Sequence, residues 1–351
     1  MIRVLVIDDS AVMRAFLSRV IGAQPDMELL GASPDPLLAS DRIRRNPPDV
    51  ITLDVEMPRM NGLDFLRSLM AVRPLPVIMI SSLTREGAET TMRALELGAV
   101  DFFPKPASVE GLEATAQEIA EKIRAAAGAR IMRRRPVAPS APAPAKPALP
   151  PLAHPLVPAG GQRVIGIGAS TGGVEALREL LTALPPHMPP ILIAQHMPPG
   201  FTETFARRLD TLCRLHVKQA EDNEPVRTGV AYIAPGGRHL VLARRGTGYS
   251  LRVTDDPPVN RHRPSVDTLL RSIARAAGSQ ALGVMLTGMG GDGAEAMLEM
   301  CRAGAHTIAQ DEASCVVFGM PRQAIAAGGV REVLPLQDIA GRLEALALPP
   351  A

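Results

Sequence analysis

Hydrophobic residues in the first third of the chain fall in short runs that alternate with stretches of helical periodicity. This pattern is typical of buried parallel strands connected by helices. The expected strands are Arg3–Ile7, Met27–Ala32, Val50–Leu53, Val77–Ile80 and Asp101–Phe103. The expected helices cover residues 11–22, 35–45, 62–71, 86–97 and 110–125. Five such units predict an α/β domain over residues 1–125, with a five-stranded parallel sheet between two layers of helices.

The same alternation returns in residues 162–348. The expected strands begin at Arg163 and continue at Ile191–Gln195, Arg214–Gln219, Val230–Ala234, Leu240–Ala243, Leu251–Thr254, Ala281–Leu286 and 306–309. The expected helices lie at 174–184, 201–210, 266–277, from 294, near 320–327 and near 337–347. This order predicts a three-layer α/β/α domain. We expect its sheet to be mainly parallel, with a small antiparallel excursion in the middle.

Residues 126–161 have a different composition from the segments on either side. Between Pro136 and Pro158, 9 of 23 residues are proline and six of the other 14 are alanine. Such a sequence cannot build a core and favours extended polyproline II structure. We therefore expect a linker between two domains. Within it, Arg133, Arg134 and Arg135 are compatible with contact to an acidic surface or membrane, but a solvated basic stretch is favoured.

Charge distribution and cysteine content indicate which partners and which cellular compartment are expected. Residues 1–125 carry 14 basic and 18 acidic side chains, whereas 126–161 carry five basic and no acidic ones. The basic excess thus belongs to the linker, which argues against nucleic acid as a partner. Cys213, Cys301 and Cys315 are far apart and favour reduced, buried thiols. Without a signal pattern or a long hydrophobic run, we expect a cytoplasmic protein with no membrane span.

Polar residues follow the strands of the first domain at one edge of its sheet. Asp8 and Asp9 end the first strand, Asp54 ends the third, Ser81 the fourth, and Lys105 follows the fifth. Because ligands of parallel sheets bind at the carboxyl ends of strands, these side chains should meet. Three converging carboxylates suit Mg²⁺, which commonly also contacts phosphate oxygens. The pattern predicts a site in which Asp54 is the nucleophile that accepts a phosphoryl group.

In the second domain, a glycine-rich turn from Gly166 to Gly173 carries Ser170 between a strand and a helix. Residues Gly168 to Gly172 fit G-x-S-x-G, the turn that exposes a nucleophilic serine. The same turn is compatible with nucleotide binding or with a simple helix cap. Nucleotide binding would need an acidic residue about 20 positions later, which the segment 187–195 lacks.

Two further chemical groups lie at neighbouring strand ends of this domain. His196 follows the strand 191–195, and Asp292 lies in the glycine-rich loop Gly288–Gly293 after the strand 281–286. Ser170, His196 and Asp292 have the types of a nucleophile, a base and an orienting carboxylate. The loop also offers backbone N–H groups for an oxyanion. Each residue alone also fits a structural role, Asp292 as a helix N-cap for example.

The first domain closely resembles two-component receiver domains. The resemblance rests on Asp8-Asp9, Asp54, Met57-Pro58, Asn61-Gly62, Ser81 and Lys105-Pro106. It implies a flavodoxin-like fold in which a histidine kinase phosphorylates Asp54 and Mg²⁺ is held by Asp8, Asp9 and Asp54. It also implies a switch in which Ser81 moves toward the phosphate and Phe102 changes its packing, with Lys105 beside the phosphate.

The second domain resembles the catalytic domain of the chemotaxis protein-glutamate methylesterases, the CheB type. The resemblance rests on Gly166–Gly173, on Gln195 to Pro198 and on Leu286 to Gly293. It implies a Ser170–His196–Asp292 triad, a backbone oxyanion donor at Met289 and an active-site neighbour at Thr171. The implied reactions are hydrolysis of glutamate methyl esters on chemoreceptors, with release of methanol, and deamidation of receptor glutamines to glutamate.

The resemblance also implies regulation, in which the receiver covers the active-site edge until Asp54 is phosphorylated. No cofactor is expected for the esterase reaction itself. The alternative is a binding module controlled by the receiver, with a non-catalytic esterase-like domain. A DNA-binding output is disfavoured because the second domain is long, nearly neutral and rich in strands.

Overall fold

The computed structural model describes residues 1–58, 60–82, 84–105, 109–131 and 163–347. The chain divides into two compact units, Met1–Arg135 and Pro136–Ala351. Most of the expected linker, Arg133 to Arg135 within it, and Pro106 lie outside the described residues. None of the helices in the described part of the chain is both long enough and hydrophobic enough to span a membrane.

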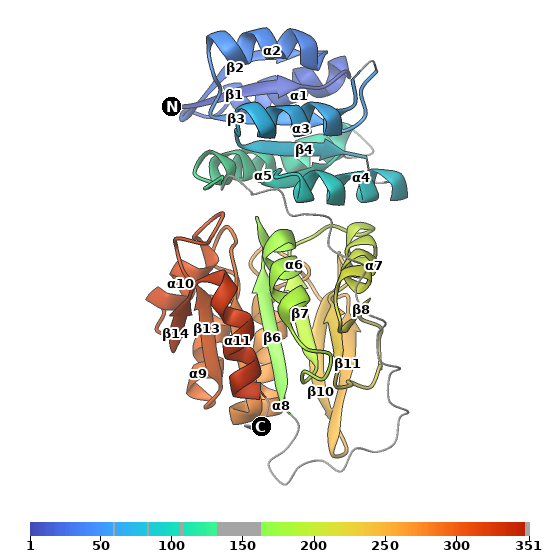
Figure 1. Cartoon of the computed structure of the whole chain (residues 1–351), viewed down its shortest axis with the longest axis vertical. Coiled ribbons are helices and arrows are strands. Elements are labelled where there is room, and N and C mark those ends of the chain that lie inside the picture. Colours follow the sequence, from blue (N-terminus) through green and yellow to red (C-terminus); the bar gives the residue numbers. More distant parts are fainter. Residues whose placement is uncertain (59, 83, 106–108, 132–162, 348–351) are drawn as a thin grey trace. The chain divides into compact units, whose positions relative to one another are not determined.

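The first unit contains the five strand–helix pairs that the sequence predicts (Figure 1). They are β1 (Ile2–Ile7), α1 (Ala11–Gly22), β2 (Met27–Ser33), α2 (Pro36–Arg45), β3 (Val50–Asp54), α3 (Gly62–Val72), β4 (Val77–Ser81), α4 (Arg85–Glu96), β5 (Asp101–Pro104) and α5 (Val109–Ala127). The strand order is β2-β1-β3-β4-β5, and all four pairings are parallel. The flavodoxin-like prediction is confirmed, although α5 ends two residues beyond the expected end at 125.

Local sequence explains where these helices begin. Side chains of Ser10, Asp35, Asn61 and Thr84 accept hydrogen bonds from backbone N–H groups in the first turns of α1 to α4. Each such cap contributes about 1 kcal/mol to helix stability. All residues of β3 and β4 are buried. The carboxyl ends of these two strands are therefore held firmly at the centre of the sheet.

The second unit is a larger parallel sheet with a separate hairpin (Figure 1). Its strands are β6 (Val164–Ala169), β7 (Ile191–Gln195), β8 (His216–Gln219), β9 (Val230–Ile233), β10 (His239–Arg245), β11 (Gly248–Thr254), β12 (Ala281–Met285), β13 (His306–Gln310) and β14 (Glu332–Leu334). Seven of them form one sheet in the order β14-β13-β12-β6-β7-β9-β8, with every pairing parallel. Among the strands in the described part of this unit, β10 and β11 are the pair with antiparallel pairing.

Helices cover both faces of this sheet. They are α6 (Gly173–Ala183), α7 (Phe201–Leu212), α8 (Val266–Ala277), α9 (Ala294–Arg302), α10 (Met320–Ala326) and α11 (Leu336–Ala347), with a 3₁₀ turn at Gly278–Gln280. Figure 1 shows α6 and α11 in front of the sheet and α8 and α9 behind it, which confirms three layers. The antiparallel excursion is confirmed as the β10–β11 hairpin, while β14 was not foreseen because it has only three residues.

Close packing between β6 and α8 explains two of the glycines in the Ser170 turn. A Cβ atom on Gly168 would lie 2.3 Å from Val266 Cγ1, and one on Gly166 would lie 2.6 Å from Ile273 Cδ1. Gly172 has a left-handed backbone with φ 79° and is the N-cap of α6. Glycine is therefore required before the turn for packing and inside it for conformation.

Candidate active site

Ser170 and His196 follow the carboxyl ends of β6 and β7, which are neighbours at the centre of the second sheet. His196 N donates to Ala169 O at 3.1 Å, and the Gln195 side-chain amide donates to Ser170 O at 2.9 Å. Asp292 reaches the same edge from the loop that follows β12, on the other side of β6. The structure therefore gathers all three predicted residues at one sheet edge.

His196 and Asp292 are in direct contact. The distance from His196 Nε2 to Asp292 Oδ2 is 2.8 Å, and the side chains are 9% and 1% exposed. The other ring nitrogen, Nδ1, is buried and has no hydrogen-bond partner among the residues that the structure describes. A histidine whose Nε2–H donates to a carboxylate presents the lone pair of Nδ1 as an acceptor.

Asp292 accepts an unusual number of hydrogen bonds. Besides His196, the donors are Asn260 Nδ2 at 2.9 Å, Ser265 Oγ at 2.9 Å, and the backbone N–H groups of Val266 at 2.6 Å and Asp267 at 3.3 Å. Burial raises the pKa of Asp292, but the hydrogen bond and the charge of His196, with these donors, outweigh it and lower the pKa to about 2. Asp292 is thus an ionised carboxylate at neutral pH, held at the amino end of α8.

Ser170 is half-buried, and its backbone is fixed on both sides. Its N–H donates to Thr287 O at 3.1 Å, and its C=O accepts from Gly173 N at 2.7 Å. Among the described residues, the Ser170 hydroxyl makes no hydrogen bond to His196. The His196–Asp292 hydrogen bond is therefore present and Ser170 lies at the adjacent strand end, but the serine–histidine hydrogen bond is absent among these residues.

The Gly288–Gly293 loop lies directly against Ser170. A Cβ atom on Gly288 would be 2.8 Å from Ser170 Cβ, so only glycine permits this approach. Met289, the next residue, is half-buried, and Thr171 is buried with its C=O accepting from Thr287 Oγ1 at 3.0 Å. Both predicted neighbours of the serine are thus on segments that contact it or follow it directly.

Sequence patterns did not predict four residues around the His196–Asp292 pair. Asn260 and Ser265 donate to Asp292, Asp267 is buried beside it, and His262 stacks on the ring of His196. Ser265 also caps α8, because its side chain accepts a hydrogen bond from Thr268 N. The available signal was the polar run 260–265 immediately before an amphipathic helix.

The first unit contains the predicted acidic cluster. Carboxylate oxygens of Asp8, Asp9 and Asp54 all lie within 4.8 Å of one another. Lys105 Nζ lies 2.6 Å from Asp54 Oδ2 and 3.3 Å from Asp8 Oδ2. Asp8 and Asp54 are buried, whereas Asp9 is exposed. All four side chains therefore converge at the carboxyl edge of this sheet.

The electrostatics of this cluster favour an added cation. Burial, followed by the negative charge of Asp8, raises the pKa of Asp54 to about 6, although Lys105 acts in the opposite direction. Burial likewise raises the pKa of Asp8. Asp8 Oδ2 accepts no hydrogen bond among the described residues, although Lys105 lies near it. Three carboxylates with unused oxygen lone pairs fit the ligand preference of Mg²⁺.

The two residues predicted to form the switch, Ser81 and Phe102, are both buried. The Ser81 hydroxyl donates to Gly87 O at 3.1 Å and accepts from Thr91 Oγ1 at 2.7 Å. Phe102 is 4% exposed, and the Lys122 ammonium lies 6.0 Å from the centre of its ring. Ser81 thus bonds to α4 rather than to Asp54 in this structure.

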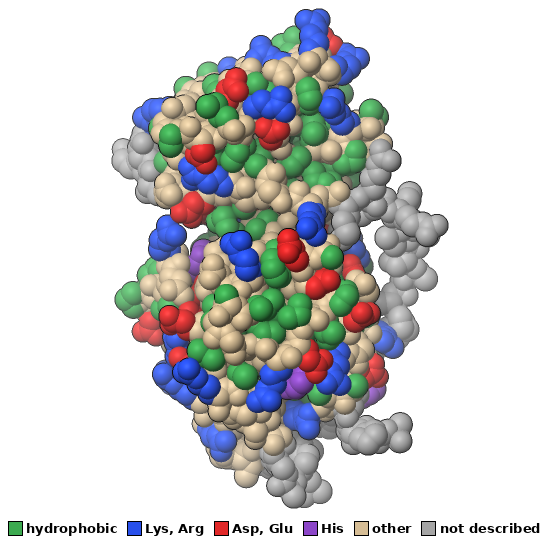
Figure 2. All heavy atoms as spheres, turned by 90° about the vertical axis from the view of Figure 1, so that its left-hand side faces the viewer, with side chains coloured by type: hydrophobic (Ala, Val, Ile, Leu, Met, Phe, Trp, Pro, Cys, Tyr) green, Lys and Arg blue, Asp and Glu red, His purple; other side chains and the backbone are tan. Residues whose placement is uncertain are grey.

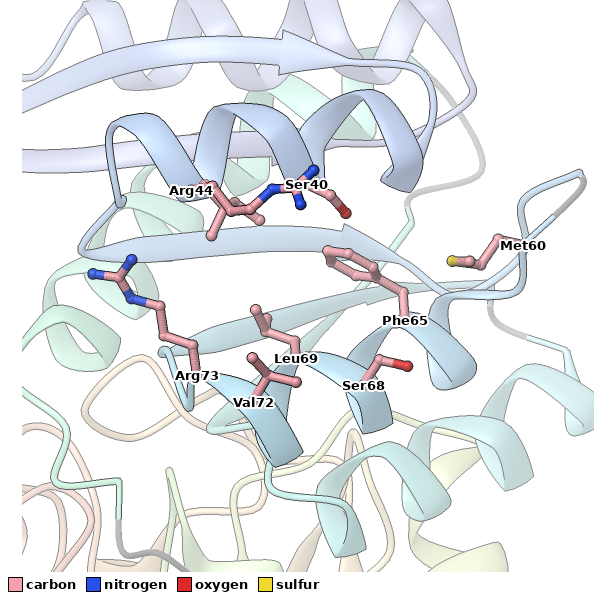
Figure 3. A pocket seen from close by; sticks show the side chains of 9 residues that line it. Ser40, Arg44, Met60, Phe65, Ser68, Leu69, Val72 and Arg73 are labelled. Atoms are coloured by element: carbon pink, nitrogen blue, oxygen red, sulfur yellow. The ribbon is translucent and has the colours of Figure 1, made fainter.

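A separate pocket of about 310 Å³ lies between α2 and α3 of the first unit. Figure 3 shows Phe65, Leu69 and Val72 of α3 opposite Arg44 of α2. None of the predicted site residues lines this pocket. On the faces shown in Figure 2, Lys and Arg side chains are interspersed with Asp and Glu on both units, so neither sign forms one continuous patch there.

The two units and their polar edges together define a class of protein. A five-stranded receiver-type unit with an acidic edge precedes a parallel α/β unit with a Ser–His–Asp edge. The class is that of response regulators with an enzyme domain as output.

Comparison with known proteins identifies the family within this class. The chain matches the CheB methylesterase family over residues 165–343 and the response regulator receiver domain over residues 4–117. Protein-glutamate methylesterase/protein-glutamine glutaminase 3 of Burkholderia lata is 57% identical over 347 residues, which are 98% of this chain and 95% of that protein. The corresponding protein of Pectobacterium atrosepticum is 57% identical over 345 residues, covering 97% and 96%.

A solved structure agrees with these sequence matches. The crystal structure of the Thermotoga maritima CheB methylesterase catalytic domain superimposes with a TM-score of 0.52 at 40% identity. The match covers 53% of this chain and 100% of that domain. The chain therefore belongs to the CheB methylesterase family and is a response regulator with an enzyme domain.

Proposed function

We propose that this protein hydrolyses methyl esters of glutamate side chains on chemoreceptors, releasing methanol, and deamidates receptor glutamines to glutamate. The observation that carries the proposal is the buried His196–Asp292 pair at the sheet edge that also carries Ser170. The relatives that are 57% identical over nearly the whole chain bear the names of both activities.

The chemistry follows from the positions of these groups. Ser170 Oγ attacks the ester carbonyl carbon while its proton passes to His196 Nδ1, the ring nitrogen that has no other partner. The C–O bond to the methoxy group then breaks, and His196 returns the proton to form methanol. Water, deprotonated by the same nitrogen, attacks the acyl-enzyme and frees glutamate and Ser170. Asp292 stabilises the imidazolium in both steps.

Charge that develops on the carbonyl oxygen also needs donors. We assign this role to backbone N–H groups of the Gly288–Gly293 loop, with Met289 as the donor closest in sequence to the Ser170 contact. Thr171 is the neighbour that fixes the loop through Thr287. In deamidation the same steps release ammonia in place of methanol.

The receiver supplies the control. We propose that residues 1–125 form the regulatory domain, 126–161 the linker and 162–348 the catalytic domain. Asp8, Asp9 and Asp54 would hold Mg²⁺, which when bound neutralises charge on the incoming phosphoryl group. A chemotaxis histidine kinase is the proposed phosphodonor, Asp54 accepts the group, and Lys105 contacts it. Ser81 and Phe102 then change their packing. We expect this to take place in the cytoplasm.

In the unphosphorylated protein the receiver is proposed to inhibit the esterase, and phosphorylation shifts the population toward an open form. The alternative, a receiver-controlled binding module without catalysis, is less favoured because the predicted triad residues are all present at one edge. It remains a distinct outcome of the assay below.

The test is methanol release from methylated receptor membranes by the full-length protein, with and without Mg²⁺ and an acyl phosphate. Ser170→Ala should reduce the rate on the order of 10³-fold or more, because no other group replaces the nucleophile. Ser279→Ala is the matched control, since Ser279 is an exposed serine of the same unit. A folded wild type that releases no methanol under any condition would favour the binding module.

A further inference from the structure

A tight turn at residues 259–262 precedes α8 and contacts both His196 and Asp292. Its end residues exchange two backbone hydrogen bonds, His262 N to Val259 O at 2.9 Å and Val259 N to His262 O at 3.1 Å. The two residues between them have left-handed backbones, with φ 52° at Asn260 and 67° at Arg261. Positive φ at both central positions is the signature of a type I′ turn.

Such a backbone is uncommon for arginine and persists only where the surroundings impose it. The contacts made by the side chains on either side of Arg261 hold the backbone in this conformation. Asn260 is directed to a buried carboxylate and His262 to a buried ring. The turn therefore presents two side chains to two members of the predicted triad at once.

Asn260 joins two buried carboxylates. Its Nδ2 donates to Asp292 Oδ1 at 2.9 Å and to Asp267 Oδ2 at 2.6 Å. Asp267 is 2% exposed, and its other oxygen accepts from Ala296 N at 2.9 Å. A single amide thus bridges two like charges, which would otherwise repel each other, and fixes the rotation of the Asp292 carboxylate.

His262 holds the ring of His196 from one face. The ring centroids are 3.8 Å apart and the planes differ by 12°, so the two rings are stacked. Stacking constrains the ring plane but leaves the in-plane nitrogens of His196 uncovered, with Nε2 bonded to Asp292 and Nδ1 without a partner among the described residues. The face of a neutral aromatic ring also favours a positive charge beside it, as on the imidazolium that forms during the reaction.

We propose that Asn260 and His262 are positioning residues that align the His196–Asp292 pair, Asn260 through the carboxylate and His262 through the ring. The inference rests on the proposed function, because it concerns the geometry of the same base. Misplacement of a catalytic group by about 1 Å lowers rates on the order of 100-fold, so the loss should fall on kcat rather than on substrate binding.

The test uses the full-length protein, an acyl phosphate and methylated receptor membranes at several concentrations, which separates kcat from KM. His262→Ala should lower kcat about 10- to 100-fold with KM changed less than about twofold. His262→Phe keeps a flat ring and should recover to within about threefold of wild type, whereas His262→Gln, of similar size, should stay low. The control is His187→Ala, an exposed histidine near the amino end of β7.

Asn260 is tested in the same assay. Asn260→Ala should lower kcat, and Asn260→Asp should lower it further because a third carboxylate would face Asp267 and Asp292. Melting temperatures identify variants that fail to fold, and for His262 the Phe and Gln variants still decide the question if the Ala variant does not fold. Wild-type kcat in His262→Gln, or equal losses in His262→Phe and His262→Ala, overturns the inference. A folded wild type without activity overturns the proposed function itself.

Discussion

At the scale of single residues, two buried aspartates show how neighbours decide the charge of a carboxyl group. Asp292 and Asp54 are both buried, and burial raises the pKa of each. Asp292 also accepts five hydrogen bonds, which carry its pKa down to about 2. Asp54 has the charge of Asp8 beside it, and its pKa is about 6. The two pKa values differ because of the hydrogen-bond donors and charges around each carboxyl group, not because of the depth of burial.

The low pKa of Asp292 predicts a pH-dependent contribution to stability. A pKa lowered from 3.8 to about 2 stabilises the folded state above about pH 4, and the contribution is lost as the pH falls toward 2. Asp292→Asn should therefore lower the free energy of unfolding by about 2 kcal/mol at pH 5 to 7. Urea unfolding at a series of pH values should show the gap narrowing below pH 4. A gap that is constant down to pH 3 would contradict this assignment.

At the scale of elements, the approach of α8 to β6 places the triad. Gly166 and Gly168 leave room for Ile273 and Val266, so the amino end of α8 lies beside the carboxyl end of β6. That helix end supplies two of the backbone donors to Asp292. A motif that resembles a nucleophile elbow is thus also a packing motif, and its glycines serve the neighbouring helix as well as the turn.

This contact predicts the effect of one added methyl group. Gly168→Ala should lower the free energy of unfolding by about 1–3 kcal/mol, because its Cβ would meet Val266 Cγ1 at 2.3 Å. It should also lower activity, since α8 must shift. Gly341→Ala in α11 is the matched control, with nothing within 4 Å of the added atom. That change should stabilise by about 0.5–1 kcal/mol. Equal effects of both variants in chemical denaturation would argue against the close-packing explanation.

At the scale of the whole molecule, two parallel sheets use the same edge for chemistry. In each unit the polar side chains lie at or just after the ends of buried strands. The rigid sheet therefore fixes their positions, and the loops after the strands contribute the reactive residue types. The receiver cluster collects three carboxylates and a lysine, and the esterase cluster collects a serine, a histidine and a carboxylate. One chain therefore carries a candidate phosphorylation site and a candidate hydrolase site, and their coupling is part of the proposed function.

This coupling is tested by removing the phosphoacceptor alone. Asp54→Asn should retain basal esterase activity and lose activation by an acyl phosphate, because the amide accepts no phosphoryl group. Methanol release with and without the phosphodonor measures both properties. Asp41→Asn, at an exposed aspartate of the same unit, should be activated like wild type. If Asp54→Asn is activated as strongly as wild type, Asp54 is not part of the switch.

The sequence by itself determined the order of elements and the residues at the strand ends. Hydrophobic periodicity is a local property, and it located both parallel sheets and the positions of Asp54, Ser170 and His196. A parallel sheet then brings its carboxyl ends together by geometry, so the two clusters could be predicted without coordinates. The three-residue strand β14 is too short for such a pattern and was missed.

Only the tertiary structure decided which groups support the predicted site. Asn260 and Asp292 are 32 positions apart, and His262 reaches His196 from a turn between β11 and α8. No local pattern encodes these contacts, because they depend on how closely α8 packs on β6 and on a left-handed turn at Asn260 and Arg261. The hydrogen bonds of Ser81 to Thr91 and Gly87 likewise depend on how β4 packs against α4. Side-chain partners are set by packing between elements, and packing exists only in the folded chain.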